Sequence, residues 1–321
     1  NLGTSHVHAG TLNLTGNASQ MTLTSGARLQ GGTNLAAGTG TTDTLTLENG
    51  SLSTFRLGTT SDQINVTGTD GLTVTSGATH TATIVPAAQL NITDAFVLFD
   101  YEGTIPGDGV SGITASLPNP HYGFSVNDDV ANTQVKLKID SIDALIWTGA
   151  GGPTWDVENT TSWKTESDGM PSDFYEFDIV KFDDTGAAGT VTLSGTINPA
   201  TTEFDVSSNV YKLAGAGIAG AGGLTKKGTA TTILTNTNTY TGLTDVQAGT
   251  LQVGDGGTSG TLGGSGNVNV ATGATLAFNR SDNTSFGRTV VGGGDLVKDG
   301  AGDLTMTGAN HAVCLLYTSP S

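Results

Sequence analysis

Histidine and serine are the residues through which this chain could act as a nucleophilic catalyst. The 321 residues include 5 histidines and many serines, and a serine activated by a neighbouring histidine can attack an acyl group. No serine stands in a Gly-x-Ser-x-Gly motif, the turn that presents such a nucleophile between a strand and a helix. His6 and His8 lie where a second copy of the same phrase has Asp245 and Gln247, so we interpret both as exposed strand residues. The sequence therefore predicts no catalytic residue and no enzyme.

Paired carboxylates could instead cleave glycosidic bonds. Asp128-Asp129 and Asp183-Asp184 are adjacent in sequence, and neighbouring residues of a strand point to opposite faces. A glycosidase needs two carboxyl groups that converge on one bond, which in a stacked β fold means carboxylates from successive coils. We find no such ladder in the sequence.

A calcium site is the next chemistry that an acidic, glycine-rich chain suggests, because such chains can bind the ion in repeated turns. The segment GGGDLVKDGAGD, residues 292–303, has the right residue types. It contains Lys298, it lacks a nine-residue recurrence, and it forms part of a longer repeat. We expect no metal site and no cofactor.

The three tryptophans of the chain leave two interpretations open. Trp147, Trp155 and Trp163 are spaced eight residues apart, so they do not form one face of a short strand. Their rings could line a groove and stack on sugars. Alternatively, they plug a junction between two blocks of the fold, which is the interpretation that we favour.

Two phrases occur twice, and they indicate the elements that must position these residues. SHVHAGTLNL (residues 5–14) returns as TDVQAGTLQV (244–253), at a constant offset of 239 residues. GLTKKGTATTILTNTN (from 223) returns as DLVKDGAGDLTMTGAN (from 295), at an offset of 72. Such internal repeats are typical of stacked, solenoid-like architectures.

The composition favours strands over helices. The chain has 48 glycines and only 13% charged residues, and Val, Ile and Leu recur at alternate positions between Thr, Ser and Asn. Thr, Asn and Gly are poor helix formers, and alternation of period two indicates strands. The phrases MTLTSGARL (21–29) and VNVATGATL (268–276) each read as a strand, a glycine corner and the next strand. The sequence predicts an all-β fold, a parallel β-helix (β-solenoid) of about 20 residues per coil.

Charge and cysteine content exclude several classes of protein. The net charge is −17 with only 12 basic residues, so nucleic acid is not an expected partner. No apolar run approaches the roughly 20 residues that span a bilayer, which predicts no transmembrane segment. The single cysteine, Cys314, excludes an intrachain disulfide framework.

The pattern divides the chain into five segments. Two solenoid blocks are separated by an irregular β insertion, and both ends look cut within a repeat. The last residues fit no repeat and resemble a translated sequencing adapter. The predicted segments are a solenoid block (1–85), a closing β segment (86–146), a Trp-containing irregular β segment (147–184), a second solenoid block (185–310) and a non-native tail (311–321).

Residues 220–254 of the second block, GAGGLTKKGTATTILTNTNTYTGLTDVQAGTLQVG, resemble the autotransporter-associated β-strand repeat, also called the passenger-associated transport repeat. The family pattern opens with Gly-Gly-Leu-x-Lys-x-Gly, continues with Asn-Thr-Tyr-x-Gly and closes with Ala-Gly-Thr-Leu. Residues 292–310 resemble a truncated second copy. Ile233-Leu234 departs from the pattern, since the family more often has Thr-Leu-x-Leu. The matching residues, which we expect to be structural, are Gly222, Gly223, Leu224, Lys226, Gly228, Asn238, Tyr240, Gly242, Ala248, Gly249, Thr250 and Leu251.

The resemblance implies a passenger that is exported across the outer membrane of a Gram-negative bacterium and displayed at the cell surface or released. It implies an outer-membrane translocator barrel, missing from this segment, as a partner, and possible host, cell-surface or glycan ligands. Passengers on this scaffold include adhesins, proteases and lipases, so the fold alone does not give the activity. We expect a non-catalytic structural or adhesive passenger. The alternative is a carbohydrate-binding or polysaccharide-active β-helix protein.

Overall fold

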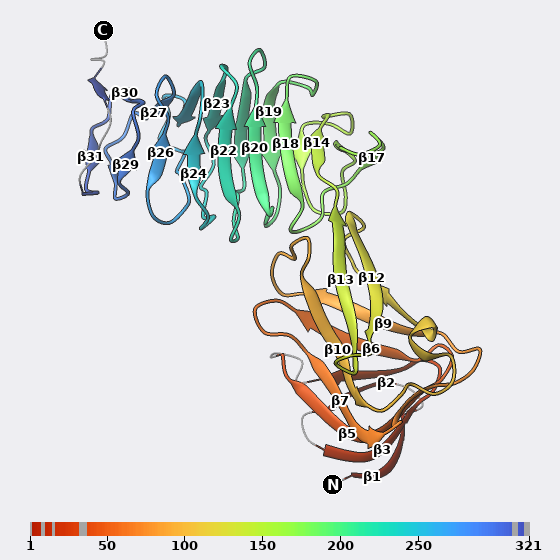
Figure 1. The fold of residues 1–321 in the computed structure, drawn as a ribbon. Helices are drawn as coiled ribbons and strands as arrows, with labels where there is room; N and C mark the ends of the chain where they lie inside the picture. The colour runs from red at the N-terminus through yellow and green to blue at the C-terminus, as the bar shows by residue number, and fades with distance from the viewer. Residues whose placement is uncertain (1, 8–9, 15–16, 32–36, 310–313, 318–321) are drawn as a thin grey trace. The chain divides into compact units, whose positions relative to one another are not determined.

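The computed structural model of the chain describes residues 2–7, 10–14, 17–31, 37–309 and 314–317. These residues form strands β1 to β32 and one short 3-10 helix, η1 (Gly109–Gly112), with no α-helix among them. The chain divides into two compact units, Asn1–Ile142 and Asp143–Ser321, called unit 1 and unit 2 below (Figure 1). The prediction of an all-β fold with parallel sheets is confirmed.

Strands β1 to β7 of unit 1 contribute alternately to two sheets, and the later strands join the same two sheets. Sheet A contains, in spatial order, β1 (Leu2–Val7), β3 (Asn17–Leu23), β5 (Thr39–Leu47), β7 (Gln63–Thr69), β10 (Ala95–Glu102), β13 (Gln134–Ile142) and β12 (Tyr122–Asp129), with β8 (Leu72–Val74) also paired to β5. Sheet B contains β11 (Ile113–Ser116), β9 (His80–Pro86), β6 (Leu52–Leu57), β4 (Ala27–Gly31) and β2 (Gly10–Leu14). All pairings of sheet B are parallel, as are those of sheet A from β1 to β10.

The interior of unit 1 follows from the alternation of apolar residues. Met21, Leu45 and Leu72 are register partners on neighbouring strands of sheet A and are at most 2% exposed. Phe55 of sheet B meets Phe99 of sheet A edge-on, with ring centroids 5.4 Å apart. Burying each such apolar side chain stabilises the fold by roughly 1.5–3 kcal/mol. Inward side chains at equivalent positions of successive strands therefore stack into one continuous core.

Antiparallel pairing ends sheet A. Strand β13 pairs antiparallel with both β10 and β12, while the other edge of β10 pairs in parallel with β7. The segment that we expected to close the first block therefore contains both kinds of pairing, and it belongs to unit 1 up to residue 142.

Unit 2 repeats the alternation with longer columns of short strands. Sheet C contains β17 (Pro171–Ser172), β16 (Trp163–Thr165), β14 (Leu145–Trp147), β18 (Ile179–Asp183), β20 (Thr201–Asp205), β22 (Gly223–Lys227), β24 (Thr244–Val246), β26 (Val268–Val270) and β29 (Val290–Val291). Sheet D contains β15 (Thr154–Trp155), β19 (Gly189–Leu193), β21 (Tyr211–Gly215), β23 (Thr231–Leu234), β25 (Thr250–Val253), β27 (Thr275–Asn279), β30 (Asp295–Asp299) and β32 (Cys314–Tyr317). From β18 to β29 in sheet C, and throughout sheet D, the pairings are parallel.

A third column of pairings follows sheet D in unit 2. After β19, β21, β23 and β25 of sheet D the chain forms isolated parallel bridges, which join Ile197 to Ile218 and Thr237 to Thr261. Near the C-terminal end this column becomes the two-stranded parallel sheet E, β28 (Thr284–Phe286) with β31 (Leu304–Met306). The strand order C, D, third column recurs along the chain, in agreement with a β-helix-like fold.

Coil length varies along unit 2. The register partners Thr231 and Thr250 are 19 residues apart, whereas Thr250 and Thr275 are 25 apart. The longer coil contains the loop of residues 254–267, between β25 and β26. The coils of unit 2 are thus close to the predicted length of about 20 residues, and the longest one differs by its loop.

The predicted non-native tail lies partly outside the described residues, because 311–313 and 318–321 are not described. Within it, β32 pairs in parallel with β30, with Cys314 opposite Asp295. The origin of this tail stays a prediction.

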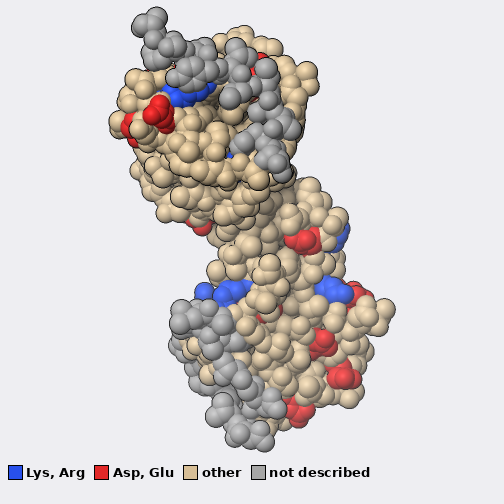
Figure 2. Space-filling view, turned by 90° about the vertical axis from the view of Figure 1, so that its left-hand side faces the viewer, with Lys and Arg blue, Asp and Glu red and all other residues tan. Residues whose placement is uncertain are grey.

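The described surface carries few charges. On the face drawn in Figure 2, Lys and Arg side chains stand as separate small groups, some of them beside Asp or Glu, and form no continuous basic patch. None of the described helices has the length and apolarity to span a bilayer.

Candidate functional sites: the repeat motif, the tryptophan cluster and the pockets

Lys226, the lysine of the repeat motif, is buried inside a corner of unit 2. It occupies an inward position of β22 and is 0% exposed. Its ammonium donates to the carbonyl oxygens of Lys227 and Gly228, the latter at 2.8 Å, and lies 3.4 Å from that of Ala248 in the next coil. Burial lowers its pKa from 10.5 to about 8, against the opposing effect of Asp205 and Asp184. The lysine therefore ties a corner to its neighbour through backbone atoms.

The second copy of the motif repeats this arrangement. Lys298 is 6% exposed and donates to the carbonyl oxygens of Asp299 and Gly300 at 2.6 and 2.8 Å. The glycine two positions after each lysine has a positive φ, +64° at Gly228 and +76° at Gly300. A Cβ at either glycine would also clash with a carbonyl oxygen of the preceding coil. Only glycine fits there without strain, which explains the Lys-x-Gly spacing.

The two copies lie in different sheets, which the sequence did not indicate. Lys226 is on β22 of sheet C, and Lys298 is on β30 of sheet D. A lysine that binds the carbonyls of its own corner needs no particular neighbour, so the motif can occur on either sheet.

Asn238, the asparagine of the motif, joins three successive coils. Its Oδ1 accepts from the backbone N–H of Ile218 at 2.9 Å, and its Nδ2 donates to the carbonyl of Thr261 at 2.9 Å and to Asn236 Oδ1 at 3.0 Å. The side chain is 5% exposed. Each hydrogen bond offsets the desolvation of a buried polar group, so this asparagine links neighbouring coils through its buried amide.

Tyr240 and the remaining motif residues fill the interior or the corners. Tyr240 is 1% exposed and its hydroxyl shares a 2.8 Å hydrogen bond with Thr244 Oγ1, and burial raises its pKa to about 12. Leu224 and Leu251 belong to the core of unit 2. At Gly249, φ is +61° and an added Cβ would lie 2.6 Å from the carbonyl oxygen of Ala230.

The three tryptophans lie together in the first coil of unit 2. Trp147, Trp155 and Trp163 are 1%, 0% and 1% exposed. Trp163 meets Trp147 and Trp155 edge-on, with ring centroids 5.0 and 5.1 Å apart, and all three rings contact Phe182 of the next coil. The antiparallel strands β16 and β17 end sheet C at this point. All three indole rings are thus buried at the end of a strand column, and their role as a plug stays a prediction.

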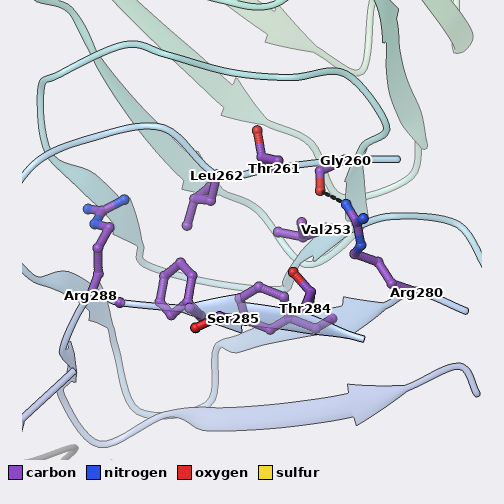
Figure 3. Close-up of a pocket in the computed structure, with 11 residues that line it drawn as sticks. Val253, Gly260, Thr261, Leu262, Arg280, Thr284, Ser285 and Arg288 are labelled. Atoms are coloured by element: carbon purple, nitrogen blue, oxygen red, sulfur yellow. Dashed lines mark hydrogen bonds between the residues drawn. The ribbon is translucent and has the colours of Figure 1, made fainter. Parts of the chain in front are cut away.

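A pocket of about 250 Å³ opens where the third column of unit 2 is interrupted (Figure 3). Thr261 and Leu262 lie on one side of it, Thr284 on the other, and Arg280 and Arg288 stand at opposite ends. No pairing joins Thr261 to β28 in the described part of the chain. The pocket is thus the gap that the long coil leaves in this column.

Both arginines of this pocket hold the long loop in place. Arg280 donates to the carbonyls of Gly260 and Thr258, each at 2.5 Å, and pairs with Asp282 at 2.7 Å. Arg288 donates to the carbonyl of Gly266 at 3.0 Å, and also contacts the carbonyls of Gly263 and Asn267. Because both guanidinium groups are hydrogen-bonded to carbonyl oxygens of the loop, they hold the loop in position. Among the residues that line the pocket, no nucleophile has a neighbouring base.

The carboxylate pairs have separate partners. Asp128 accepts from the Tyr101 hydroxyl at 2.6 Å, whereas Asp129 pairs with Lys136 at 2.6 Å. Asp184 accepts from three successive backbone N–H groups, residues 207–209, and these hydrogen bonds lower its pKa.

One carboxylate pair lies on successive coils and was not predicted from the sequence. Asp183 of β18 and Asp205 of β20 are register partners, and Lys227 follows in the same row. Asp205 is exposed on the outer face, where nothing desolvates a carboxyl group as a general acid requires. Their spacing of 22 residues equals one coil. It could have indicated the pair only if the coil boundaries had been known.

A buried serine–histidine group in unit 1 was also missed. His80 Nδ1 lies 2.8 Å from Ser51 Oγ, and its Nε2 lies 2.8 Å from Ser53 Oγ. The Ser51 hydroxyl donates its hydrogen bond to the carbonyl of Glu48 at 2.6 Å. Ser51 Oγ must therefore accept from His80, so His80 Nδ1 carries the imidazole proton and the Ser53 hydroxyl donates to Nε2. All three side chains are 0% exposed, and burial lowers the His80 pKa to about 3. No substrate can contact this group, which is structural.

Some histidines of the chain cannot be placed. His8 and His311 are not among the described residues, and nothing is described of the His6 side chain. Among the described residues, no group of three or more His, Cys, Asp or Glu side chains is arranged to hold a metal ion.

Comparison with known proteins identifies the repeat. The family model of the passenger-associated transport repeat matches residues 224–253 and 296–318. The Adhesin BmaC autotransporter of Brucella suis biovar 1 (strain 1330) is 32% identical over 154 residues, which cover 39% of this chain and 4% of that protein. No solved structure matches the chain. The two matched segments contain the lysine corners described above, so the chain contains two copies of the passenger-associated transport repeat and is similar to a part of an autotransporter adhesin.

Proposed function

We propose that this chain is a non-catalytic segment of a large surface-displayed or secreted bacterial passenger, in which stacked coils carry or form an adhesive surface. The observation that carries this proposal is that the polar groups of the repeat motif are buried and bonded to backbone atoms or to one another. Lys226, Lys298 and Asn238 all bind within or between coils. A motif occupied in this way maintains a scaffold and leaves ligand contacts to the outer surface.

The scaffold itself is proposed to be a closed β-solenoid. The recurring order of sheet C, sheet D and the third column supports this proposal, and coils of 19 to 25 residues suit three short strands each. Electron microscopy of the purified full-length protein would show thin rods if the proposal holds, and compact particles if it does not.

The export route is a proposal that rests on the matched family and the similar adhesin. We propose display at the cell surface or release, through an outer-membrane translocator outside this chain. The chain spans about 4% of the length of the adhesin that it resembles, so the adhesive target belongs to the whole protein.

Surface display and adhesion can be tested on the native producing cells. Antibodies against this chain should label intact cells, and protease added outside should remove the label. Labelling that requires permeabilised cells would contradict surface display. Fab fragments that bind the chain should reduce cell attachment, and attachment that is unchanged would leave a purely structural role.

The absence of catalysis has a separate test. We expect no turnover of polysaccharide or ester substrates by the purified protein. Turnover that a single Asp or Ser substitution abolishes would contradict the proposal, and Asp205→Asn is the first substitution to try because its carboxylate lies beside that of Asp183.

A further inference from the structure

A second pocket, in unit 1, has the polar and aromatic lining that sugar rings require. It has a volume of about 240 Å³ and is lined by, among others, Thr59, Gln89, Asn91, Asp94 and Phe96. These residues come from the corner after β6, the segment after β9 and the start of β10. The volume equals that of roughly eight water molecules, enough for one hexose ring and too small for a folded partner's loop.

The polar side chains of this pocket keep unused hydrogen-bonding capacity. Asp94 Oδ2 accepts from the backbone N–H of Asn91 at 2.7 Å and lies 3.3 Å from Asn91 Nδ2. No described residue bonds to Asp94 Oδ1, to Asn91 Oδ1 or to the Gln89 amide. An amide offers two donors and an acceptor, and a carboxylate offers acceptors only. Together they can bind a pair of neighbouring hydroxyl groups, which both donate and accept.

Phe96 supplies the apolar side of the pocket. It is half-buried and packs against the core of unit 1, and it lines the pocket on its exposed part. Aromatic faces bind apolar surface and leave the polar edge of a ligand free. A pyranose ring combines the two requirements, with C–H groups on its face and hydroxyl groups around its edge.

The charge of the pocket restricts the class of sugar. None of its lining residues is Lys or Arg, and Asp94 places a carboxylate in it. The chain as a whole carries a net charge of −17. A sialic acid or uronic acid would meet uncompensated repulsion, whereas a neutral hexose would not.

We propose that this pocket of unit 1 binds the neutral hexopyranose end of a glycan. Asp94 and Gln89 would bind its hydroxyl groups, and Phe96 would contact the C–H face of its ring. This site is separate from the repeat motif and from the tryptophans, and binding to it does not depend on surface display.

The test begins with a glycan array probed with the purified full chain. The array carries oligosaccharides that end in neutral hexoses, in sialic acid and in uronic acid. We expect binding to neutral hexose ends and none to acidic ends. No binding to any neutral hexose, or a preference for acidic ends, would overturn the proposal.

Variants then place the binding in the pocket. Gln89→Ala removes an amide that has no partner in the described fold, and Asp94→Asn keeps an acceptor for the Asn91 N–H. The loss of each hydrogen bond should lower the affinity for the hexose oligosaccharide about tenfold. Titration calorimetry measures this change. Asn127→Ala, which alters only an exposed contact with Ser125 in the same unit, is the matched control and should bind as the wild type does.

A folding readout separates lost binding from lost structure. Thermal unfolding of Gln89→Ala should match that of the wild type, because the amide makes no contact that holds the fold. Unchanged affinity in both pocket variants would place the glycan elsewhere and overturn the assignment, whatever the outcome of the surface-display experiment.

Discussion

The two units bury different ionisable groups and satisfy them in different ways. In unit 1, neutral His80 lies between the hydroxyls of Ser51 and Ser53, on a neighbouring strand. In unit 2, Lys226 binds carbonyl oxygens of its own corner. The hydroxyl partners of His80 require particular residues on the neighbouring coil, whereas the carbonyl partners of Lys226 belong to the backbone and are present at every corner. This difference explains why the lysine corner recurs, while the histidine group is found once in the part of the chain that the structure describes.

The largest expected effect concerns the tryptophan plug of unit 2. Trp155→Ala should destabilise unit 2 by about 3–5 kcal/mol, because it leaves a cavity among Trp163, Phe174 and Phe182. Chemical denaturation followed by the fluorescence of the other two tryptophans measures this change. A variant that keeps its stability but loses glycan binding would contradict the plug and revive a sugar site there.

Acid should destabilise unit 1 through His80. The native state keeps His80 neutral down to about pH 3, while the unfolded chain protonates it near 6.5. The unfolded state therefore binds the additional proton between these values, and unit 1 should lose roughly 2–4 kcal/mol by pH 4. Hydrogen exchange with mass spectrometry reports each unit through its own peptides.

His80→Leu is the control for this acid effect. It removes the titrating ring, and Ser51 keeps its hydrogen bond to the Glu48 carbonyl. The variant should show a smaller loss of protection in unit 1 between pH 6.5 and 4 than the wild type. An equal loss in both proteins would assign the acid sensitivity to carboxylates.

Alkali should have the opposite effect on unit 2 through Lys226. Because its pKa is about 8 in the native state and 10.5 unfolded, the unfolded state binds more protons between these values. The stability of the wild type should then rise relative to Lys226→Met by roughly 1–2 kcal/mol from pH 8 to pH 10. Denaturation at each pH measures this difference, and a difference that is constant with pH would show that Lys226 is solvated.

A smaller effect is expected at Thr93 in unit 1. This residue has φ +77°, which strains a β-branched side chain by roughly 1–2 kcal/mol. Thr93→Gly should relieve the strain at an entropic cost and raise the stability of unit 1 by about 0.5–1 kcal/mol. Thr104→Gly, at an exposed loop position with no positive φ, should lower stability instead.

The strands, the glycine corners and the passenger-associated transport repeat could be predicted from the sequence, because each depends on a local pattern of residues. Leu224 and Leu251 alternate with polar residues, and Gly228 follows its lysine at a fixed spacing. The group around His80 could not be predicted, since its partners lie 27 and 29 residues away. That Lys226 and Lys298 lie in different sheets could not be predicted either. The coils between them include a strand of the third column and differ in length.

The burial of the motif lysines is the feature on which the scaffold role of the repeat depends most directly, and amine labelling of the native protein tests it. Lys226 and Lys227 are neighbours in the same motif, yet Lys226 is 0% exposed while the Lys227 side chain is 37% exposed and pairs with Glu203. Short treatment with an amine-reactive reagent, read out by mass spectrometry, should modify Lys227 and the more exposed Lys138. Lys226 and Lys298 should remain unmodified until the protein is unfolded. Labelling of Lys226 at the rate of Lys227 in the folded protein would contradict the account.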